Sequence, residues 1–255
     1  MLIIRGFSLS GGDLNDRLLI PEPGRINEWY RQLKTYSFRI FLRDVIKHQD
    51  FFRPEDVARF TSLEVAEKYI RYLETAGLIQ HEDDGYFLTD RPVKSFGKTL
   101  EWYIAQIFER EFALETLWGK RFKGQFCGGD FDVLSRIENL ILYTEVKSSP
   151  PKGVYDSEIS SYMDRFSDLS PDLSIFFLDT ELRMKDKIVP MFEKELKRRY
   201  RKTPPVVRME KELFHINNRI FLVNAKGGIA NNLSRVFTWY FRNRNPLTEN
   251  ERTLT

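Results

Sequence analysis

The chain has 255 residues and a formal net charge of +3, with 42% hydrophobic and 30% charged residues. This composition excludes a disordered chain and predicts one large domain or two smaller ones. No apolar run reaches the roughly 18 residues that a membrane span needs, so we expect no membrane partner.

Cysteine and histidine are too scarce to build a metal site by themselves. Cys127 is the only cysteine, which excludes an internal disulfide, and three scattered histidines accompany it. A thiolate zinc site is therefore excluded, and any catalytic metal must be held mainly by carboxylates, which favours Mg²⁺ or Mn²⁺. Residues 1–13 are too short and too soon interrupted for a secretory signal, so we expect a cytoplasmic protein.

Positive charge is concentrated in the last part of the chain. Residues 181–255 carry 17 Lys and Arg against 8 Asp and Glu, net +9, whereas residues 1–180 are net acidic. A nucleic-acid backbone is one partner that such a region suits. A solvated charged surface is the alternative reading.

Residues 1–35 are expected to form an N-terminal extension. Gly11-Gly12 and the run Pro21–Gly24 interrupt regular structure. From Ile26 to Gln49 apolar residues recur at helical spacing, and we predict a break in the helix near Thr35–Ser37.

Residues 36–92 carry the signals of further helices and a hairpin. Pro54 suits the first turn of a helix, and Thr61-Ser62-Leu63-Glu64 predicts a capping box at the start of the next one. Gly77 predicts the end of that helix, and Asp83-Asp84-Gly85 predicts a β-hairpin. In this order, and particularly in SLEVAEKYIRYLETAGLI, the segment resembles a winged helix-turn-helix domain.

The resemblance implies that the second helix of the motif enters the major groove of DNA. Its outward residues include Lys68 and Arg71, which become candidate nucleic-acid contacts. The expected wing carries Glu82, Asp83 and Asp84, which repel phosphates, so a protein partner or a homodimer through this domain is the alternative role.

Residues 93–255 are expected to form one domain with a mixed α/β fold, after a linker at residues 91–96. The expected elements are helices at 98–112, 157–169, 185–200 and 230–243, strands at 126–134, 140–148 and 173–178, and a hairpin of 206–209 with 221–223 or a segment nearby.

The stretch GGDFDVLSRIENLILYTEVKSS, residues 128–149, carries the chemistry. Side chains alternate along a strand, so Glu145 and Lys147 project from one face while Val146 points to the other. A turn at Arg136–Asn139 would bring Asp132 beside Glu145 on the neighbouring strand. A divalent cation offsets the repulsion between two carboxylates, and Lys147 beside them can orient an attacking water.

This arrangement resembles the PD-(D/E)xK, or restriction endonuclease-like, nuclease superfamily. The resemblance implies that Asp132 and Glu145 are metal ligands together with the backbone carbonyl of Val146, that Lys147 is the catalytic lysine, and that Glu101 on the preceding helix is an accessory ligand. Gly129-Asp130 stands where the family name has Pro-Asp, which leaves Asp130 as a rival to Asp132.

Several other residues are secondary candidates. Ser148 follows the lysine and could contact a phosphate, and the basic run containing Lys197, Arg198 and Arg199 could track a nucleic-acid backbone. Tyr162 and Arg165 could face the same cleft, with a packed aromatic and a surface cation as the alternative readings.

These expectations combine into a Mg²⁺-dependent endonuclease that cleaves DNA and recognises DNA or a partner through a winged-helix module. The alternatives are a non-catalytic DNA-binding regulator with a nuclease-like domain, and a nuclease that acts on RNA. Cleavage of both strands would suggest a homodimer, because one such site normally attends to one strand.

Overall fold

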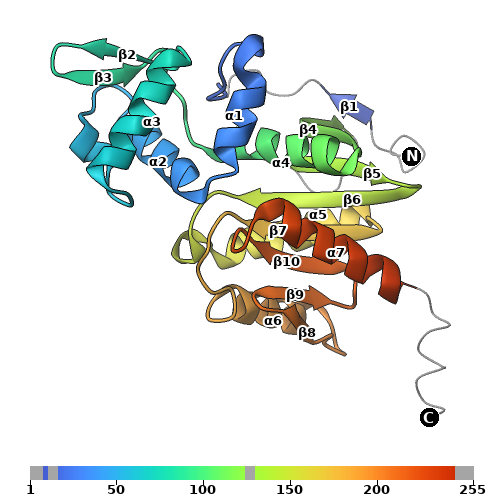
Figure 1. The fold of residues 1–255 in the computed structure, drawn as a ribbon. Coiled ribbons are helices and arrows are strands. Elements are labelled where there is room, and N and C mark those ends of the chain that lie inside the picture. Colours follow the sequence, from blue (N-terminus) through green and yellow to red (C-terminus); the bar gives the residue numbers. More distant parts are fainter. Residues whose placement is uncertain (1–7, 11–16, 124–129, 245–255) are drawn as a thin grey trace. The chain divides into compact units, whose positions relative to one another are not determined.

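The computed structural model describes residues 8–10, 17–123 and 130–244, and these fall into two compact units (Figure 1). One unit comprises Asp13–Gln106, and the other comprises Met1–Gly12 with Ile107–Thr255. Cys127 and the beginning of the strand expected at 126–134 lie outside the described residues.

The unit Asp13–Gln106 is mainly helical and carries a small hairpin. Its elements are η2 (Pro23–Arg25), α1 (Ile26–Leu33), α2 (Tyr36–Lys47), η3 (Pro54–Val57), α3 (Leu63–Thr75), β2 (Ile79–Glu82), β3 (Gly85–Leu88) and the first part of α4 (Gly97–Phe112). The expected helix break near residue 35 is confirmed, since α1 and α2 meet around Thr35. The element at Pro54 is a single 3₁₀ turn.

The start of α3 differs from the expected capping box. Ser62 is the N-cap, and its hydroxyl accepts a hydrogen bond from the Val65 amide at 3.4 Å. The helix begins one residue later than a box centred on Thr61 requires, so the third helical position is Val65 and Glu64 cannot complete the reciprocal bond. Gly77 adopts a φ of 72° just beyond the helix, as expected for a left-handed terminating residue.

Aromatic rings build the core of this unit. The ring of Phe38 lies 5.5 Å from Trp29 and 4.9 Å from Tyr69, centroid to centroid, in edge-to-face geometry. The hairpin is confirmed: β2 and β3 pair antiparallel from Ile79↔Leu88 to Glu82↔Gly85.

The second unit is built on an eight-stranded mixed sheet of order β1-β4-β5-β6-β7-β10-β9-β8. Its strands are β1 (Ser8–Ser10), β4 (Glu115–Lys123), β5 (Asp130–Ile137), β6 (Leu140–Lys147), β7 (Leu173–Leu178), β8 (Val206–Glu210), β9 (Leu213–Ile216) and β10 (Ile220–Asn224). Strands β6, β7 and β10 are parallel, so their carboxyl ends meet at one edge of the sheet. The mixed α/β class is therefore confirmed.

The strands expected at 206–209 and 221–223 form as β8 and β10, but their expected pairing as a hairpin is wrong. An additional strand, β9, pairs antiparallel with both β8 and β10, and β10 pairs parallel with β7. Strand β9 is only four residues long and entirely buried, so it shows no alternation of polar and apolar residues. Strand β4 was also not expected from the sequence.

Helices cover both faces of this sheet (Figure 1). They are α5 (Asp156–Leu169), α6 (Ile188–Arg199) and α7 (Ile229–Asn243), and the short η4 (Pro151–Gly153) precedes α5. Tyr162 of α5 and Phe192 of α6 pack with Phe176 of β7 on one face. On the other face Trp239 of α7 packs on His215 of β9.

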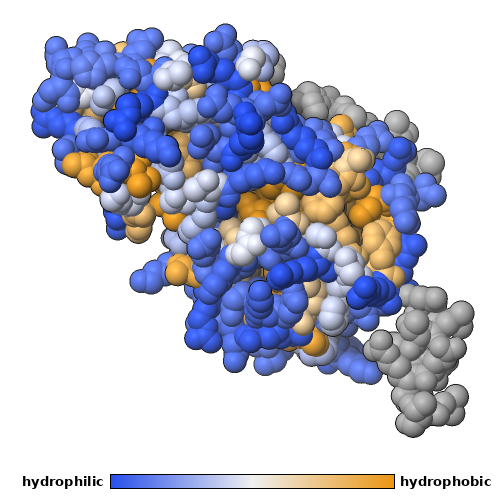
Figure 2. All heavy atoms as spheres, viewed as in Figure 1, coloured by the Kyte–Doolittle hydropathy of each residue, from blue (hydrophilic) through white to orange (hydrophobic). Residues whose placement is uncertain are grey.

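Hydrophilic residues cover most of the face seen in Figure 2, and hydrophobic ones reach it in separate patches. Across the described part of the chain, no helix combines the length and apolarity that crossing a bilayer requires.

Candidate active site

Asp132 on β5 is held against β6 by a side-chain hydrogen bond. The described pairing of β5 with β6 ends at Val133↔Thr144, and the same register would next place Asp132 opposite Glu145. Instead, Oδ2 of Asp132 accepts a hydrogen bond from the backbone amide of Val146 at 2.7 Å. The structure therefore brings Asp132 beside the segment Glu145–Lys147, as the alternation of the two strands predicted.

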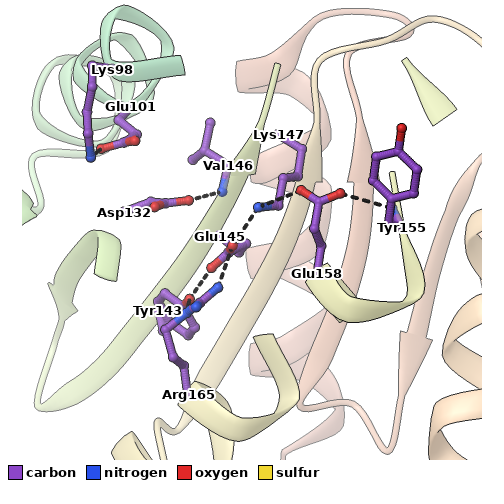
Figure 3. A network of polar contacts seen from close by, with 10 residues as sticks. All are labelled: Lys98, Glu101, Asp132, Tyr143, Glu145, Val146, Lys147, Tyr155, Glu158 and Arg165. Carbon is purple, nitrogen blue, oxygen red and sulfur yellow. Dashed lines mark hydrogen bonds and ion pairs between the residues drawn. The ribbon is translucent and has the colours of Figure 1, made fainter. Parts of the chain in front are cut away.

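Glu145 lies at the centre of a charged network and is 1% exposed (Figure 3). Its Oε1 accepts from Lys147 Nζ at 3.0 Å and from an Arg165 guanidinium nitrogen at 2.6 Å. Its Oε2 accepts from the hydroxyl of Tyr143, which in turn accepts from Nε of Arg165 at 2.9 Å. Two cations and one neutral donor therefore hold this carboxylate in one orientation.

Lys147 has a second carboxylate partner on α5. Its Nζ lies 3.2 Å from Oε1 of Glu158, while Oε2 of Glu158 accepts from the backbone amide of Tyr155 at 2.9 Å. The side chain of Lys147 is 19% exposed, so its ammonium can still reach a bound molecule.

These contacts set the charge of each group. Burial raises the pKa of Glu145, but Lys147 and Arg165 outweigh it and hold that pKa below its ordinary value. Burial lowers the pKa of Lys147, but Glu145 and Asp132 more than reverse this and the net direction is upward. Burial is the largest cause that raises the pKa of Tyr143 well above its ordinary value. At neutral pH the site therefore holds a carboxylate, an ammonium and a neutral phenol.

The oxygen atoms present suit a hard divalent cation. In a strand, the N–H and C=O of one residue point to the same side, and the next residue points to the other. Because the Val146 amide faces Asp132 and the Lys147 carbonyl accepts from Asp179 on the β7 side, the Val146 carbonyl is directed toward the β5 side of the strand, the side on which Asp132 lies. A carboxylate offers about four acceptor positions, of which Glu145 uses three in the contacts above.

Residues 8–10, 17–123 and 130–244 contain no group of three His, Cys, Asp or Glu side chains spaced to hold a metal. A cation bound here would therefore have two carboxylates and one carbonyl from these residues and would complete its shell with water or substrate. Mg²⁺ commonly binds in this manner, because it keeps several of its waters.

Glu101 belongs to the other unit. It lies on α4, is 6% exposed, and its Oε2 accepts from Lys98 Nζ at 2.9 Å. Its expected role as an accessory ligand stays a prediction.

The residues that were expected to contact phosphates differ in whether they already form ion pairs with other side chains of the protein. Ser148 directly follows β6 and is half-buried, while Lys197 and Lys68 are exposed. Arg198 and Arg199 both contact Glu195. The engaged side chains would have to leave these partners to bind a phosphate.

Two further ion pairs involve residues that were expected to contact phosphates. Arg199 also pairs with Asp164 at 2.6 Å, and the Arg71 guanidinium lies 3.8 Å from the Glu67 carboxylate.

Sequence reasoning gave too little weight to α5. Arg165 is only a secondary candidate in the sequence, and Glu158 is not predicted at all. In the structure Arg165 contacts Glu145 and Glu158 contacts Lys147, both on β6. Their spacing of seven residues, two helical turns, places them on one face of α5 and was the signal available. Tyr162 is a packed aromatic, buried with its hydroxyl 2.6 Å from that of Ser174.

No family model and no curated protein matches the chain. Solved structures that are similar to it include Can2 from Sulfobacillus thermosulfidooxidans in complex with cyclic tetra-adenylate, and protein VC1899 from Vibrio cholerae. Identity to Can2 is 13% with a TM-score of 0.49, over 94% of this chain and 59% of Can2. Identity to VC1899 is 14% with a TM-score of 0.44, over 72% of this chain and 52% of VC1899. The chain thus spans little more than half of either structure, and we draw no functional conclusion from these likenesses.

Proposed function

We propose that this protein is a metal-dependent endonuclease of the PD-(D/E)xK type that hydrolyses DNA phosphodiester bonds with Mg²⁺ or Mn²⁺. The observation that carries the proposal is the meeting of Asp132, Glu145 and Lys147 on the neighbouring strands β5 and β6, with the Val146 amide bonded to Asp132. Two acids and an ammonium in this arrangement suit phosphate chemistry at a hard cation.

Each residue would have a distinct part in the reaction. Asp132, Glu145 and the Val146 carbonyl would hold the cation, which when bound supplies Lewis-acid polarisation of the phosphate and lowers the pKa of a bound water. Lys147 is charged at neutral pH, since its pKa is raised. It would therefore orient the attacking water and stabilise developing negative charge, and it would not act as a general base. Arg165 and Tyr143 would keep Glu145 in place.

The unit Asp13–Gln106 would act as a winged-helix module for DNA or partner recognition. The order α2, η3, α3 and the β2–β3 hairpin supports this, with Lys68 and Arg71 on α3 as candidate DNA contacts. Asp84 at the hairpin turn pairs with Arg53, which offsets one of the acids that would face a phosphate backbone.

Incubation with DNA and Mg²⁺ tests the proposal, with Asp132→Asn and Lys147→Met as the informative variants. Both should lose cleavage by about 10²-fold or more, whereas Lys211→Met, at an exposed lysine between β8 and β9, should retain it. Cleavage that persists unchanged in the first two variants contradicts the proposal. Parallel digestion of single- and double-stranded DNA and RNA decides the substrate, and binding without cleavage under any divalent metal favours the regulator.

A further inference from the structure

An exposed aromatic side chain lies beside the candidate active site. Tyr155 immediately precedes α5 and is 67% exposed, although a tyrosine carries a large apolar ring. Its backbone amide is joined through Glu158 to the ammonium of Lys147 (Figure 3). The backbone of Tyr155 is thus linked through Glu158 to the residue that would contact the scissile phosphate.

The fold does not account for the Tyr155 ring. The start of α5 uses the backbone of Tyr155, whose carbonyl accepts from the Glu158 amide and whose amide donates to the Glu158 carboxylate, and any residue except proline supplies these groups. Within the part of the chain that the structure describes, no aromatic ring or cation packs on this side chain. Single exposed rings are common on protein surfaces, so the charges beside Tyr155 decide what the ring could bind.

Three lysines belong to this loop or contact it. Lys152 is exposed on η4, and its carbonyl accepts from Nζ of Lys187 at 3.0 Å, from the segment that precedes α6. Lys194 of α6 pairs with Asp156, the residue next to Tyr155. We call Lys152, Tyr155, Lys187 and Lys194 the aromatic rim. The acids in the first turn of α5, Asp156 and Glu158, each have a lysine partner, and Asp186, beside Lys187, pairs with Arg183.

An aromatic ring among lysines matches how proteins bind single-stranded nucleic acid: bases stack on the ring and cations follow the phosphates. In a duplex the bases stack on one another inside the helix, so a surface tyrosine cannot stack on them unless a base is unpaired. A protein partner would use the ring differently, through apolar burial, and would not require several lysines nearby.

We infer that the aromatic rim binds an unpaired nucleotide next to the scissile phosphate, so that single-stranded DNA is the preferred substrate of the proposed nuclease. Stacking of one base on Tyr155 would place the neighbouring phosphate toward Lys147. To call this DNA a substrate rests on the proposed nuclease function. The binding itself does not require cleavage.

The experiment measures binding in EDTA, where metal-dependent cleavage cannot occur. The anisotropy of fluorescein-labelled oligothymidylate and of a matched duplex is recorded with wild type, Tyr155→Ala and Tyr155→Phe. Because base stacking on an aromatic is worth about 1–3 kcal/mol, Tyr155→Ala should weaken single-strand binding about 5- to 150-fold and duplex binding less than twofold. Tyr155→Phe should retain the affinity. Phe60→Ala is the matched control, since Phe60 is an aromatic residue that is 59% exposed in the segment before α3, away from the basic residues 197–199.

Three outcomes overturn the inference: a wild type that does not bind the single strand, a Tyr155→Ala affinity equal to wild type, or equal weakening on single strand and duplex. Thermal unfolding of each variant tests whether the fold is retained. We expect that it is, because the Tyr155 side chain is exposed. If Tyr155→Ala loses single-strand binding but neither wild type nor any variant cleaves DNA, binding by the aromatic rim is supported and the proposed nuclease activity is contradicted. If the protein cleaves DNA but Tyr155→Ala binds the single strand as wild type does, the nuclease activity is supported and the role of the aromatic rim is contradicted.

Discussion

The carboxylate of Asp132 accepts a hydrogen bond from the amide of Val146, with 2.7 Å between Oδ2 and N. Val146 stands between Glu145 and Lys147, so this one bond ties Asp132 to the segment that carries the other two groups. It also takes the place that a strand-to-strand backbone bond would occupy if the ladder continued past Val133. Asp132 therefore has a structural part as well as a chemical one, and substitutions can separate them.

Asp132→Asn should keep the fold and lose the chemistry. The asparagine oxygen still accepts from the Val146 amide, so we expect unfolding free energy within about 1 kcal/mol of wild type and Mg²⁺-dependent cleavage lower by about 10²-fold or more. Asp132→Ala leaves the amide without this acceptor and should cost a further 1–3 kcal/mol, roughly. Urea denaturation and single-turnover cleavage measure the two effects. If Asp130→Asn abolishes cleavage and Asp132→Asn does not, the rival carboxylate is the ligand.

Magnesium should stabilise the protein through Asp132 and Glu145. A ligand that binds only the folded state at about 100 times its Kd adds about 2.7 kcal/mol. We therefore expect the unfolding temperature to rise with Mg²⁺ in wild type and to stay constant in Asp132→Asn. Differential scanning fluorimetry across a Mg²⁺ titration, with Lys211→Met as control, makes the measurement. Equal shifts in wild type and Asp132→Asn would locate the metal elsewhere.

Arg165→Met should destabilise the fold, because Arg165 is one of two cations on the buried carboxylate of Glu145. Removing one partner of a buried ion pair typically costs about 3–5 kcal/mol, and Lys147 remains to limit the loss here, so we expect about 2–3 kcal/mol. Arg165→Lys should recover only part, because an ammonium cannot reproduce the contacts of the guanidinium with Glu145 and Tyr143. A stability unchanged in Arg165→Met, measured by urea denaturation, would show that Arg165 does not hold Glu145 in solution.

Glu158→Gln should change the positioning of Lys147 more than the stability. The Glu158 side chain is 30% exposed, and exposed ion pairs contribute about 0–1 kcal/mol. Glutamine keeps an acceptor for the Tyr155 amide but loses the charge beside Lys147, so we expect a kcat lower by about 3- to 10-fold at saturating Mg²⁺. Glu193→Gln, an exposed acid on α6, serves as the control. A loss as large as that of Lys147→Met would make Glu158 part of the reaction itself.

Glu195 should make the protein sensitive to acid. Hydrogen bonds from Arg198 and Arg199, and then the charges of these two arginines, outweigh burial and lower the pKa of Glu195 from 4.5 to about 2. Because the folded pKa is below the unfolded one, this stabilisation is complete above about pH 5 and is lost as the pH falls toward 2. Because Arg198 is exposed, solvent screening limits the size of this contribution to about 1 kcal/mol.

The difference in unfolding free energy between wild type and Glu195→Gln measures this contribution. It should be largest near pH 6 and should shrink steadily on acidification, whereas Glu193→Gln should show no such trend. A difference that does not vary with pH would mean that the arginines do not favour the ionised form of Glu195.

Local patterns determined the parts of this protein that depend on periodicity. The two-residue alternation of a strand is enough to place Glu145 and Lys147 on one face, and the strand predicted at Leu173–Leu178 has the same bounds as β7. The expected helix of residues 157–169 became α5, which begins one residue earlier. The periods of a strand, 2 residues, and of a helix, 3.6 residues, involve neighbouring positions of the chain, so the pattern of polar and apolar residues in a single sequence reveals them.

Contacts between distant segments were decided only by the tertiary structure. The pairing of β9 with two neighbours, the reach of Arg165 to Glu145 across 20 residues, and the pairing of Arg199 with Asp164 have no counterpart in local spacing. They depend on which helix packs on which face of the sheet and in what register. That choice is made by burial summed over the whole core, so it cannot be read from any one stretch of the chain.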